Sequence, residues 1–286
     1  MAKTGQNTVT RRSMLAASLA GPLAFAAAPP RIRIGVTDWN LRKGANVEAV
    51  ALAASIGFEG VEISFGRKSD GGRLETDRPE VIAAYQAAFR QHQIAVAGAC
   101  IDRLHVNCLK SDDEARKWVR DAIRLSRQLN AKVLLLPFFG NCELKTRAEM
   151  DATAMALKDL AREAADAGVT LGLENTISAE NNVRILDRVG HHALKVYYDP
   201  GNAMNWGHDP YKELRWLGAE RICQIHIKDN PHYLGEGRLR WPELLQIIAE
   251  IGYSGFANLE TNAPSGDVAA DMRRNLAYIR AEMNKL

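Results

Sequence analysis

The stretch KVLLLPFFGNCELKTRAEMDATAMALKDLAREAADAGVTLGLE, residues 132–174, contains a complete strand–helix–strand repeat. Residues 133–136 are apolar throughout, which is typical of a strand buried on both faces of a parallel sheet. Helical periodicity follows over residues 146–167, and the next apolar run ends on Glu174. This stretch therefore predicts parallel strands that are connected by helices.

The same alternation extends from Arg31 almost to the end of the chain. The expected strands cover residues 32–37, 60–64, 94–101, 132–137, 169–174, 194–198, 222–227 and 255–259, and the expected helices cover 46–56, 79–92, 111–129, 146–167, 179–189, 210–217, 241–251 and 267–283. Eight such units match a closed (β/α)8 barrel, the TIM barrel, better than a doubly wound open sheet, which usually has fewer units. We find no linker rich in Pro, Gly or Ser, so residues 31–286 are predicted to form a single α/β domain.

The first 28 residues have the layout of an export signal. The pair Arg11-Arg12 precedes an apolar run over residues 14–28, which contains the small-residue motif Ala24-Phe25-Ala26. The run is shorter than the roughly 20 residues that span a bilayer, so cleavage is expected rather than a permanent anchor. The sequence predicts passage through the twin-arginine translocase to the periplasm, with no stable membrane association after cleavage.

The formal net charge of +3 comes entirely from this segment. Residues 1–28 hold three of the 37 Lys and Arg and none of the 34 Asp and Glu, so the rest of the chain carries 34 of each. A balanced body argues against a nucleic acid or a membrane surface as partner. The four cysteines form no C-x-x-C pair, and we expect buried free thiols, although an oxidising compartment permits a disulfide. They are Cys100, Cys108, Cys142 and Cys223.

Acidic and imidazole side chains occur at the ends of the last four expected strands. In chain order these are Glu174, Asp199, His226 and Glu260, separated by 25, 27 and 34 residues, each about one strand–helix unit. Because barrel strands end on a common rim, these side chains are expected to converge. Three converging carboxylates repel one another unless a cation is present, and three oxygens with one imidazole suit Mn²⁺, and also Mg²⁺, Co²⁺, Fe²⁺ or Zn²⁺. The alternative is that each carboxylate pairs with a nearby Lys or Arg.

The motifs around these residues resemble the sugar phosphate isomerase/epimerase family, part of the xylose isomerase-like TIM barrel superfamily. The resemblance covers about residues 31–283 and says little about the substrate. It implies one divalent metal ion, often Mn²⁺, held by the four residues above, and it implies that Glu174 and Glu260 form an acid/base pair on opposite sides of the substrate. The motifs are Leu173-Glu174-Asn175, Tyr198-Asp199-Pro200-Gly201-Asn202, His226-Ile227-Lys228-Asp229, Gly235-Glu236-Gly237 and Leu259-Glu260.

Such a site suits proton transfer next to a carbonyl. One carboxylate removes the proton, the metal stabilises the enediolate, and another carboxylate returns the proton, which gives epimerisation or isomerisation. Elimination from the same intermediate gives a lyase or dehydratase acting on a keto-sugar or keto-glycoside. An endonuclease IV-like phosphodiesterase is less favoured, since it needs a multi-metal cluster and a basic groove. A non-catalytic sugar-binding barrel is less favoured because the ligand set is intact.

Six further side chains are expected to face the substrate. They are Trp39, Glu62, His105, Asn202, Lys228 and Glu236. For Glu62 the alternatives are a contact with a residue that binds the substrate, or a structural ion pair, and for Glu236 the alternative is a role in orienting its neighbours. Asn202 stands where ketose epimerases of the family often carry His, and Asn can bind a hydroxyl but cannot carry a proton at neutral pH. Export favours an unphosphorylated sugar or keto-sugar, because phosphorylated sugars are largely cytoplasmic. The sequence leaves the oligomeric state open, a homo-oligomer included.

Overall fold

The computed structural model describes residues 1–2 and 32–286, and eight parallel strands in it close into a barrel. The strands are β1 (Ile32–Thr37), β2 (Gly60–Ser64), β5 (Ala95–Cys100), β6 (Val133–Pro137), β7 (Thr170–Glu174), β8 (Leu194–Tyr198), β9 (Ile222–Ile227) and β10 (Gly255–Leu259). Their order around the barrel is β1-β10-β9-β8-β7-β6-β5-β2. The predicted (β/α)8 barrel is therefore confirmed, whereas most of the predicted signal segment lies outside the described residues.

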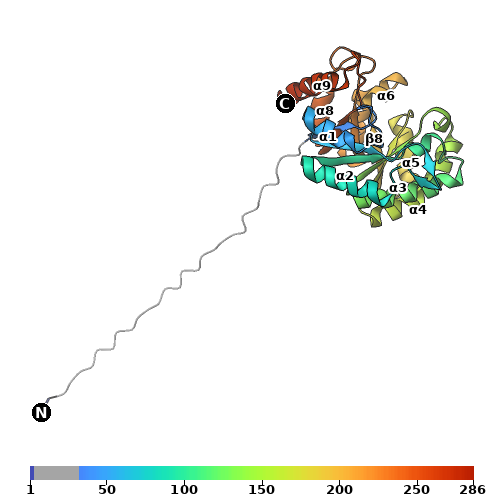
Figure 1. Ribbon diagram of the computed structural model, residues 1–286, viewed down its shortest axis with the longest axis horizontal. Helices are drawn as coiled ribbons and strands as arrows, with labels where there is room; N and C mark the ends of the chain where they lie inside the picture. The colour runs from blue at the N-terminus through green and yellow to red at the C-terminus, as the bar shows by residue number, and fades with distance from the viewer. Residues whose placement is uncertain (3–31) are drawn as a thin grey trace.

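Helices surround the barrel, as Figure 1 shows. They are α1 (Glu48–Ile56), α2 (Pro79–His92), α3 (Asp113–Leu129), α4 (Arg147–Asp166), α5 (Ala179–Val189), α7 (Pro210–Arg221), α8 (Trp241–Glu250) and α9 (Val268–Met283). Local sequence sets several of their ends. Thr146 and Glu149 form a capping box at the start of α4, and Gly57 ends α1 with a left-handed φ of 106°.

Four short features were not predicted, because they are too short to produce a hydrophobic period. They are the antiparallel pair β3 (Ser69–Asp70) and β4 (Arg73–Leu74), the helix α6 (Pro200–Asn205), and the 3-10 turns η1 (Asp102–His105) and η2 (Gly140–Cys142). Three of them, α6 and the two turns, directly follow barrel strands and so lie on the carboxyl-terminal rim. The unforeseen elements thus belong largely to the end of the barrel where chemistry is expected.

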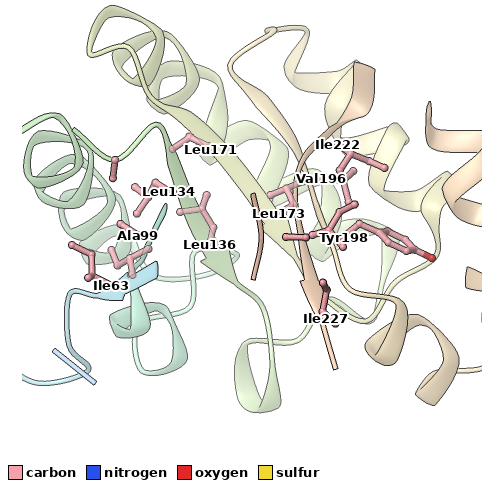
Figure 2. Packing of buried hydrophobic residues seen from close by; sticks show 14 of the residues in the cluster. Ile63, Ala99, Leu134, Leu136, Leu171, Leu173, Val196, Tyr198, Ile222 and Ile227 are labelled. Atoms are coloured by element: carbon pink, nitrogen blue, oxygen red, sulfur yellow. The ribbon is translucent and has the colours of Figure 1, made fainter. Parts of the chain in front are cut away.

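The apolar core lies mainly between the barrel and the helices (Figure 2). On β6, Leu134 and Leu136 belong to this outer core, whereas Leu135 packs inside the barrel against Cys100 and Tyr197. This alternation follows from the two-residue period of a strand. Each fully buried leucine stabilises the fold by about 1.5–3 kcal/mol relative to exposure.

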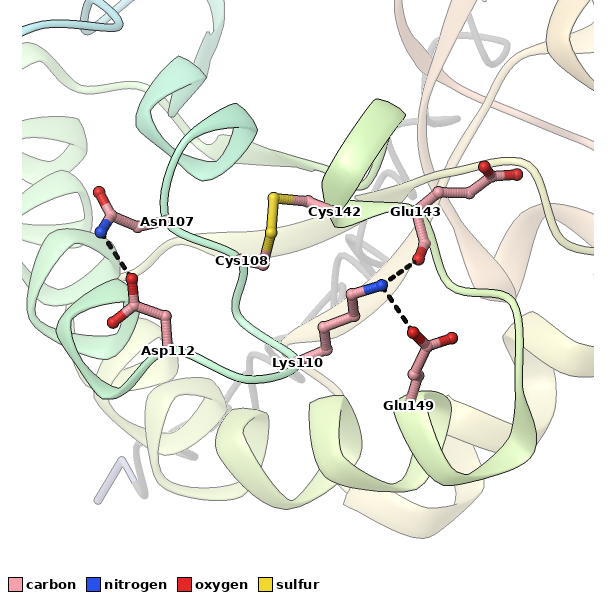
Figure 3. Close-up of a disulfide and its surroundings, with 7 residues drawn as sticks. All are labelled: Asn107, Cys108, Lys110, Asp112, Cys142, Glu143 and Glu149. Atoms are coloured by element: carbon pink, nitrogen blue, oxygen red, sulfur yellow. Dashed lines mark hydrogen bonds and ion pairs between the residues drawn. A yellow bond between two sulfur atoms is a disulfide. The ribbon is translucent and has the colours of Figure 1, made fainter.

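A disulfide joins Cys108 to Cys142, whose Cα atoms are 4.9 Å apart (Figure 3). The expectation of free thiols is wrong for this pair, although Cys100 and Cys223 are free. The two cysteines follow β5 and β6, which are neighbours in the barrel, so the fold brings together residues 34 positions apart. Beside the bond, Lys110 Nζ donates to the Glu143 carbonyl oxygen at 2.6 Å. The disulfide therefore fastens two loops of the carboxyl-terminal rim to each other.

Among residues 1–2 and 32–286, none of the helices combines the length and the hydropathy needed to cross a membrane.

Candidate active site

The four predicted ligand residues converge on the carboxyl-terminal rim. One donor atom from each of Glu174, Asp199, His226 and Glu260 can be chosen so that all lie within 4.8 Å of one another. Glu174 ends β7, His226 lies on β9, and Glu260 directly follows β10. Asp199 is the N-cap of α6, and its Oδ1 accepts a hydrogen bond from the backbone N–H of Asn202 at 2.9 Å.

His226 is held from both ring nitrogens. Its Nδ1 lies 3.1 Å from Glu174 Oε1 and 3.4 Å from Glu260 Oε2, while its Nε2 lies 3.1 Å from Glu62 Oε2. Because a carboxylate accepts, Glu62 favours the tautomer with the proton on Nε2, which directs the Nδ1 lone pair toward the other carboxylates. Burial alone would lower the pKa of His226, but the negative charges of Glu260, Glu174 and Glu62 outweigh it and raise this pKa well above its usual range. The carboxylates thus favour a positive charge at the position of His226.

Glu62 is fully buried behind His226 and does not line the cavity, so it does not fit the expected role in binding substrate. Besides His226, its Oε2 accepts hydrogen bonds from Tyr197 at 2.7 Å and from Asn258 at 2.9 Å. Tyr197 and Asn258 lie on β8 and β10. Three strands therefore contribute to orienting a histidine on a fourth.

Glu174 and Glu260 have contrasting surroundings. Burial raises the pKa of Glu174 to about 7, against the lowering effect of His226. Burial also acts to raise the pKa of Glu260, but Lys228 and His226 outweigh it and bring it down to about 2. Lys228 Nζ lies 2.6 Å from Glu260 Oε2, and Trp39 Nε1 donates to Glu260 Oε1 at 3.0 Å. Two carboxyl groups with widely separated pKa values are a common basis for acid/base catalysis.

A cavity of about 350 Å³ opens over these residues. Of the six predicted substrate contacts, four line it, namely Trp39, His105, Asn202 and Lys228. Asn202 Nδ2 donates to Glu174 Oε1 at 3.0 Å, so its amide is partly committed within the site. Glu236 lies elsewhere, because its side chain is exposed and ion-paired with Arg274.

Among the lining residues that sequence reasoning missed are Arg67, Asp102 and Phe139. Asp102 could have been found by the rule that identified Glu260, because it closely follows the expected third strand. Arg67 and Phe139 lie in loops and carry no comparable signal. A larger cavity of about 780 Å³ lies where several strands begin, between Arg33 and Phe256, but it holds none of the four converging residues. Barrel chemistry belongs to the other end.

Residues 50–282 match the xylose isomerase-like TIM barrel family, and the chain belongs to this family. It is 25% identical over 212 residues to the 2-epi-5-epi-valiolone 7-phosphate 2-epimerase of an Actinoplanes species, covering 72% of this chain and 76% of that protein. These comparisons are consistent with an enzyme of the isomerase or epimerase class.

Solved structures share the fold at lower identity. The 3-keto-D-glucoside 4-epimerase YcjR of E. coli superposes with a TM-score of 0.70 at 17% identity, over 88% of this chain and 100% of that one. The D-psicose 3-epimerase of Clostridium cellulolyticum H10, solved with D-tagatose, gives a TM-score of 0.72 at 16% identity, over 88% of this chain and 99% of that one.

Proposed function

We propose that this protein is a metal-dependent sugar isomerase or epimerase that moves a proton at a carbon next to a carbonyl. The observation that carries the proposal is the convergence of Glu174 and Glu260 on one imidazole, at 3.1 Å and 3.4 Å from His226 Nδ1, in surroundings that raise the pKa of Glu174 and lower that of Glu260. Such a pair provides an acid and a base at neutral pH. The relatives described above are a 2-epi-5-epi-valiolone 7-phosphate 2-epimerase, a 3-keto-D-glucoside 4-epimerase and a D-psicose 3-epimerase, which supports the same class.

The side chains of Glu174, Asp199, His226 and Glu260 fit one divalent cation, because they offer carboxylate oxygens and an imidazole nitrogen and no thiolate. We expect Mn²⁺, with Mg²⁺, Co²⁺, Fe²⁺ and Zn²⁺ as alternatives. When bound, the ion would polarise the substrate carbonyl and offset negative charge that develops on its oxygens. It would also add positive charge to the group of carboxylates around His226.

The carboxylates of the chain itself carry out the proton transfers. Glu174 Oε1 is engaged by Asn202 and His226, whereas no described residue donates a hydrogen bond to Oε2. We therefore assign Oε2 as the atom that takes or gives the proton. Glu260 is fixed through both oxygens by Trp39 and Lys228, and it serves the second position, where the proton returns to the opposite face or to the neighbouring carbon. Lys228 can also donate to a substrate oxygen.

A lyase or dehydratase acting on a keto-sugar or keto-glycoside is the second candidate. It is favoured by Asn202, which stands where related ketose epimerases often carry histidine and which donates to Glu174 instead. Elimination requires only that a leaving group departs from the carbon next to the deprotonated one. Both reactions begin with the same proton removal, so one set of substrates tests both.

The test is proton exchange. Metal-loaded protein is incubated in D2O with free ketoses and 3-keto sugars, and NMR follows deuterium at the carbon beside the carbonyl. We expect incorporation in the wild type and a loss of about 10²–10⁴-fold in Glu260→Gln. Glu236→Gln is the matched control, because the same chemical change is made at an exposed residue outside the cavity. An elimination product would favour the lyase, and neither deuterium nor elimination with any sugar would count against the mechanism.

We also propose export by the twin-arginine route to the periplasm. The Cys108–Cys142 disulfide supports this, since stable disulfides are typical of oxidising compartments. Export in turn favours an unphosphorylated substrate.

A further inference from the structure

The cavity has a second polar end, across the barrel from the ligand cluster. It is built on η1, which follows β5, and β5 is four places from β9 in the ring of eight strands. Asp102, the first residue of η1, therefore stands on the side of the rim opposite to His226 and Lys228. All of the reacting groups assigned above lie on β7 to β10 or directly after them. A substrate that reaches from one side to the other would contact Asp102 several bonds away from its reacting carbon.

Asp102 is fixed through one oxygen and open at the other. Its Oδ2 accepts a hydrogen bond from Ser64 Oγ. Ser64 is itself held, because its Oγ accepts from the Gly66 N–H at 3.0 Å and its N–H donates to Asp38 Oδ2 at 2.9 Å. Asp102 Oδ1 lies 4.0 Å from His105 Nε2, beyond hydrogen-bonding reach, and no described residue donates to it. The cavity thus contains a pre-positioned acceptor that lacks a donor.

The pKa of Asp102 is consistent with this shortage of donors. Burial raises this pKa, and Ser64, His105 and Arg67 only partly oppose the rise. A ligand hydroxyl that donates to Oδ1 would supply the missing hydrogen bond. Nearby walls suit the apolar face of a sugar, since Trp39 and Phe139 both line the cavity.

The charges around the cavity disfavour an anionic group. Glu174, Glu260 and Asp102 all line it. Lys228 is already paired with Asp199 at 2.7 Å and with Glu260 at 2.6 Å. Arg67 is the remaining lining cation among the described residues, and it interacts with Asp102. The lining thus holds three carboxylates, Glu174, Glu260 and Asp102, against the cations Lys228 and Arg67. A phosphate at this end would meet the negative charge of Asp102, and such repulsion disfavours competing ligands.

We propose that Asp102 is a specificity-determining residue whose Oδ1 binds hydroxyls at the non-reacting end of the substrate and selects neutral polyhydroxylated carbonyl compounds over their phosphate esters. This rests on the proposed function, which places the reacting end at Glu174 and Glu260. It makes the preference for unphosphorylated sugars a property of the cavity, independent of where the protein resides.

Calorimetric titration tests the proposal with Mn²⁺-loaded protein and matched pairs of ligands, such as D-fructose with D-fructose 6-phosphate and D-psicose with its 6-phosphate. The wild type should bind at least one free sugar about tenfold or more tightly than its phosphate. Asp102→Ala should weaken binding of that free sugar roughly tenfold, as expected for loss of a hydrogen bond to a charged group. Asp102→Asn keeps the shape and removes the charge, so the preference over the phosphate should narrow.

Three results would overturn it: no free sugar binds the wild type, a phosphate binds as tightly as its free sugar, or Asp102→Ala leaves the affinity unchanged. Thermal melts show whether each variant is folded, and Asp102→Asn is the variant that disturbs packing least. Deuterium exchange on the same samples separates this proposal from the proposed function. If deuterium exchange occurs but sugar affinity does not depend on Asp102, only the role of Asp102 is refuted. If sugar binding depends on Asp102 but no exchange occurs, only the proposed proton transfer is refuted.

Discussion

Glu62 offers a sharp test of how the site is organised, because it acts on the proposed metal ligand His226 without reaching the cavity. In Glu62→Gln the shape is retained, but the negative charge is lost and the amide N–H₂ cannot accept a hydrogen bond. Three donors now share Glu62 Oε2, from Tyr197 at 2.7 Å, Asn258 at 2.9 Å and His226 at 3.1 Å. The amide no longer requires the proton of His226 to be on Nε2, so the Nδ1 lone pair is no longer fixed toward the carboxylates.

The size of the effect follows from this geometry. A hydrogen bond to a charged group contributes about 1.5–3 kcal/mol, and loss of a partner that orients a metal-binding histidine lowers metal affinity about 10–100-fold. We therefore expect Glu62→Gln to bind Mn²⁺ about 10–100-fold more weakly than the wild type.

The assay is calorimetric titration with Mn²⁺, with a competing chelator where binding is tight. Tyr197→Phe removes one donor to Glu62 but keeps the ring that packs against His226, so a smaller loss is expected. Glu236→Gln makes the same change at an exposed position and should bind like the wild type. Thermal melts establish that each variant is folded. A folded Glu62→Gln variant with wild-type Mn²⁺ affinity would refute the orienting role of Glu62, and a wild type that binds no divalent ion would refute the metal site.

Three further predictions concern the disulfide, proton linkage and export. Cys108→Ser/Cys142→Ser removes a link across 34 residues, which should lower the free energy of unfolding by up to about 4 kcal/mol in urea titrations, and an unchanged midpoint would contradict this. Because the pKa of Glu174 is raised to about 7 and a ligand must be deprotonated, metal binding below pH 7 should release a proton from it. The apparent Mn²⁺ affinity should thus rise from pH 5.5 to 7 by up to about tenfold per pH unit, with the slope flattening toward pH 7, whereas a flat profile throughout would contradict it. Arg11→Lys/Arg12→Lys should leave the protein in the cytoplasm, which cell fractionation checks, and periplasmic recovery would argue against the twin-arginine route.

Much of the fold was predictable because hydrophobic periodicity is a local property. Five expected strands, among them 60–64 and 222–227, match the observed bounds at both ends. The expected helix 210–217 continues to Arg221 past Gly218, whose φ of 64° and ψ of 169° are not helical. Helix α6 was missed because it has only six residues, directly after its N-cap Asp199.

The residues of the candidate site also include some that the sequence predicted and some whose contacts it did not. Residues at strand ends, such as Glu174 and Glu260, were predictable because all parallel strands of a barrel end on one rim. Glu62 also lies near the carboxyl end of its strand, yet its side chain lies behind His226. The residues that donate hydrogen bonds to it, Tyr197 and Asn258, belong to strands that are distant from it in sequence. Strand order and register decide which interior side chains meet, and no local pattern encodes that.

The barrel and the four converging side chains could be predicted from the sequence alone, because both follow from a repeat of apolar runs and the residues that end them. The class of chemistry was predicted from these side chains together with the family resemblance. The three-dimensional fold was needed to establish that Cys108 meets Cys142, that Glu62 contacts His226, and that Asp102 lines the cavity. The two pairs Cys108–Cys142 and Glu62–His226 join residues that are 34 and 164 positions apart in the sequence. The place of Asp102 depends on the direction of its side chain. Barrel closure sets them, because it fixes which strands become neighbours and which stand opposite each other.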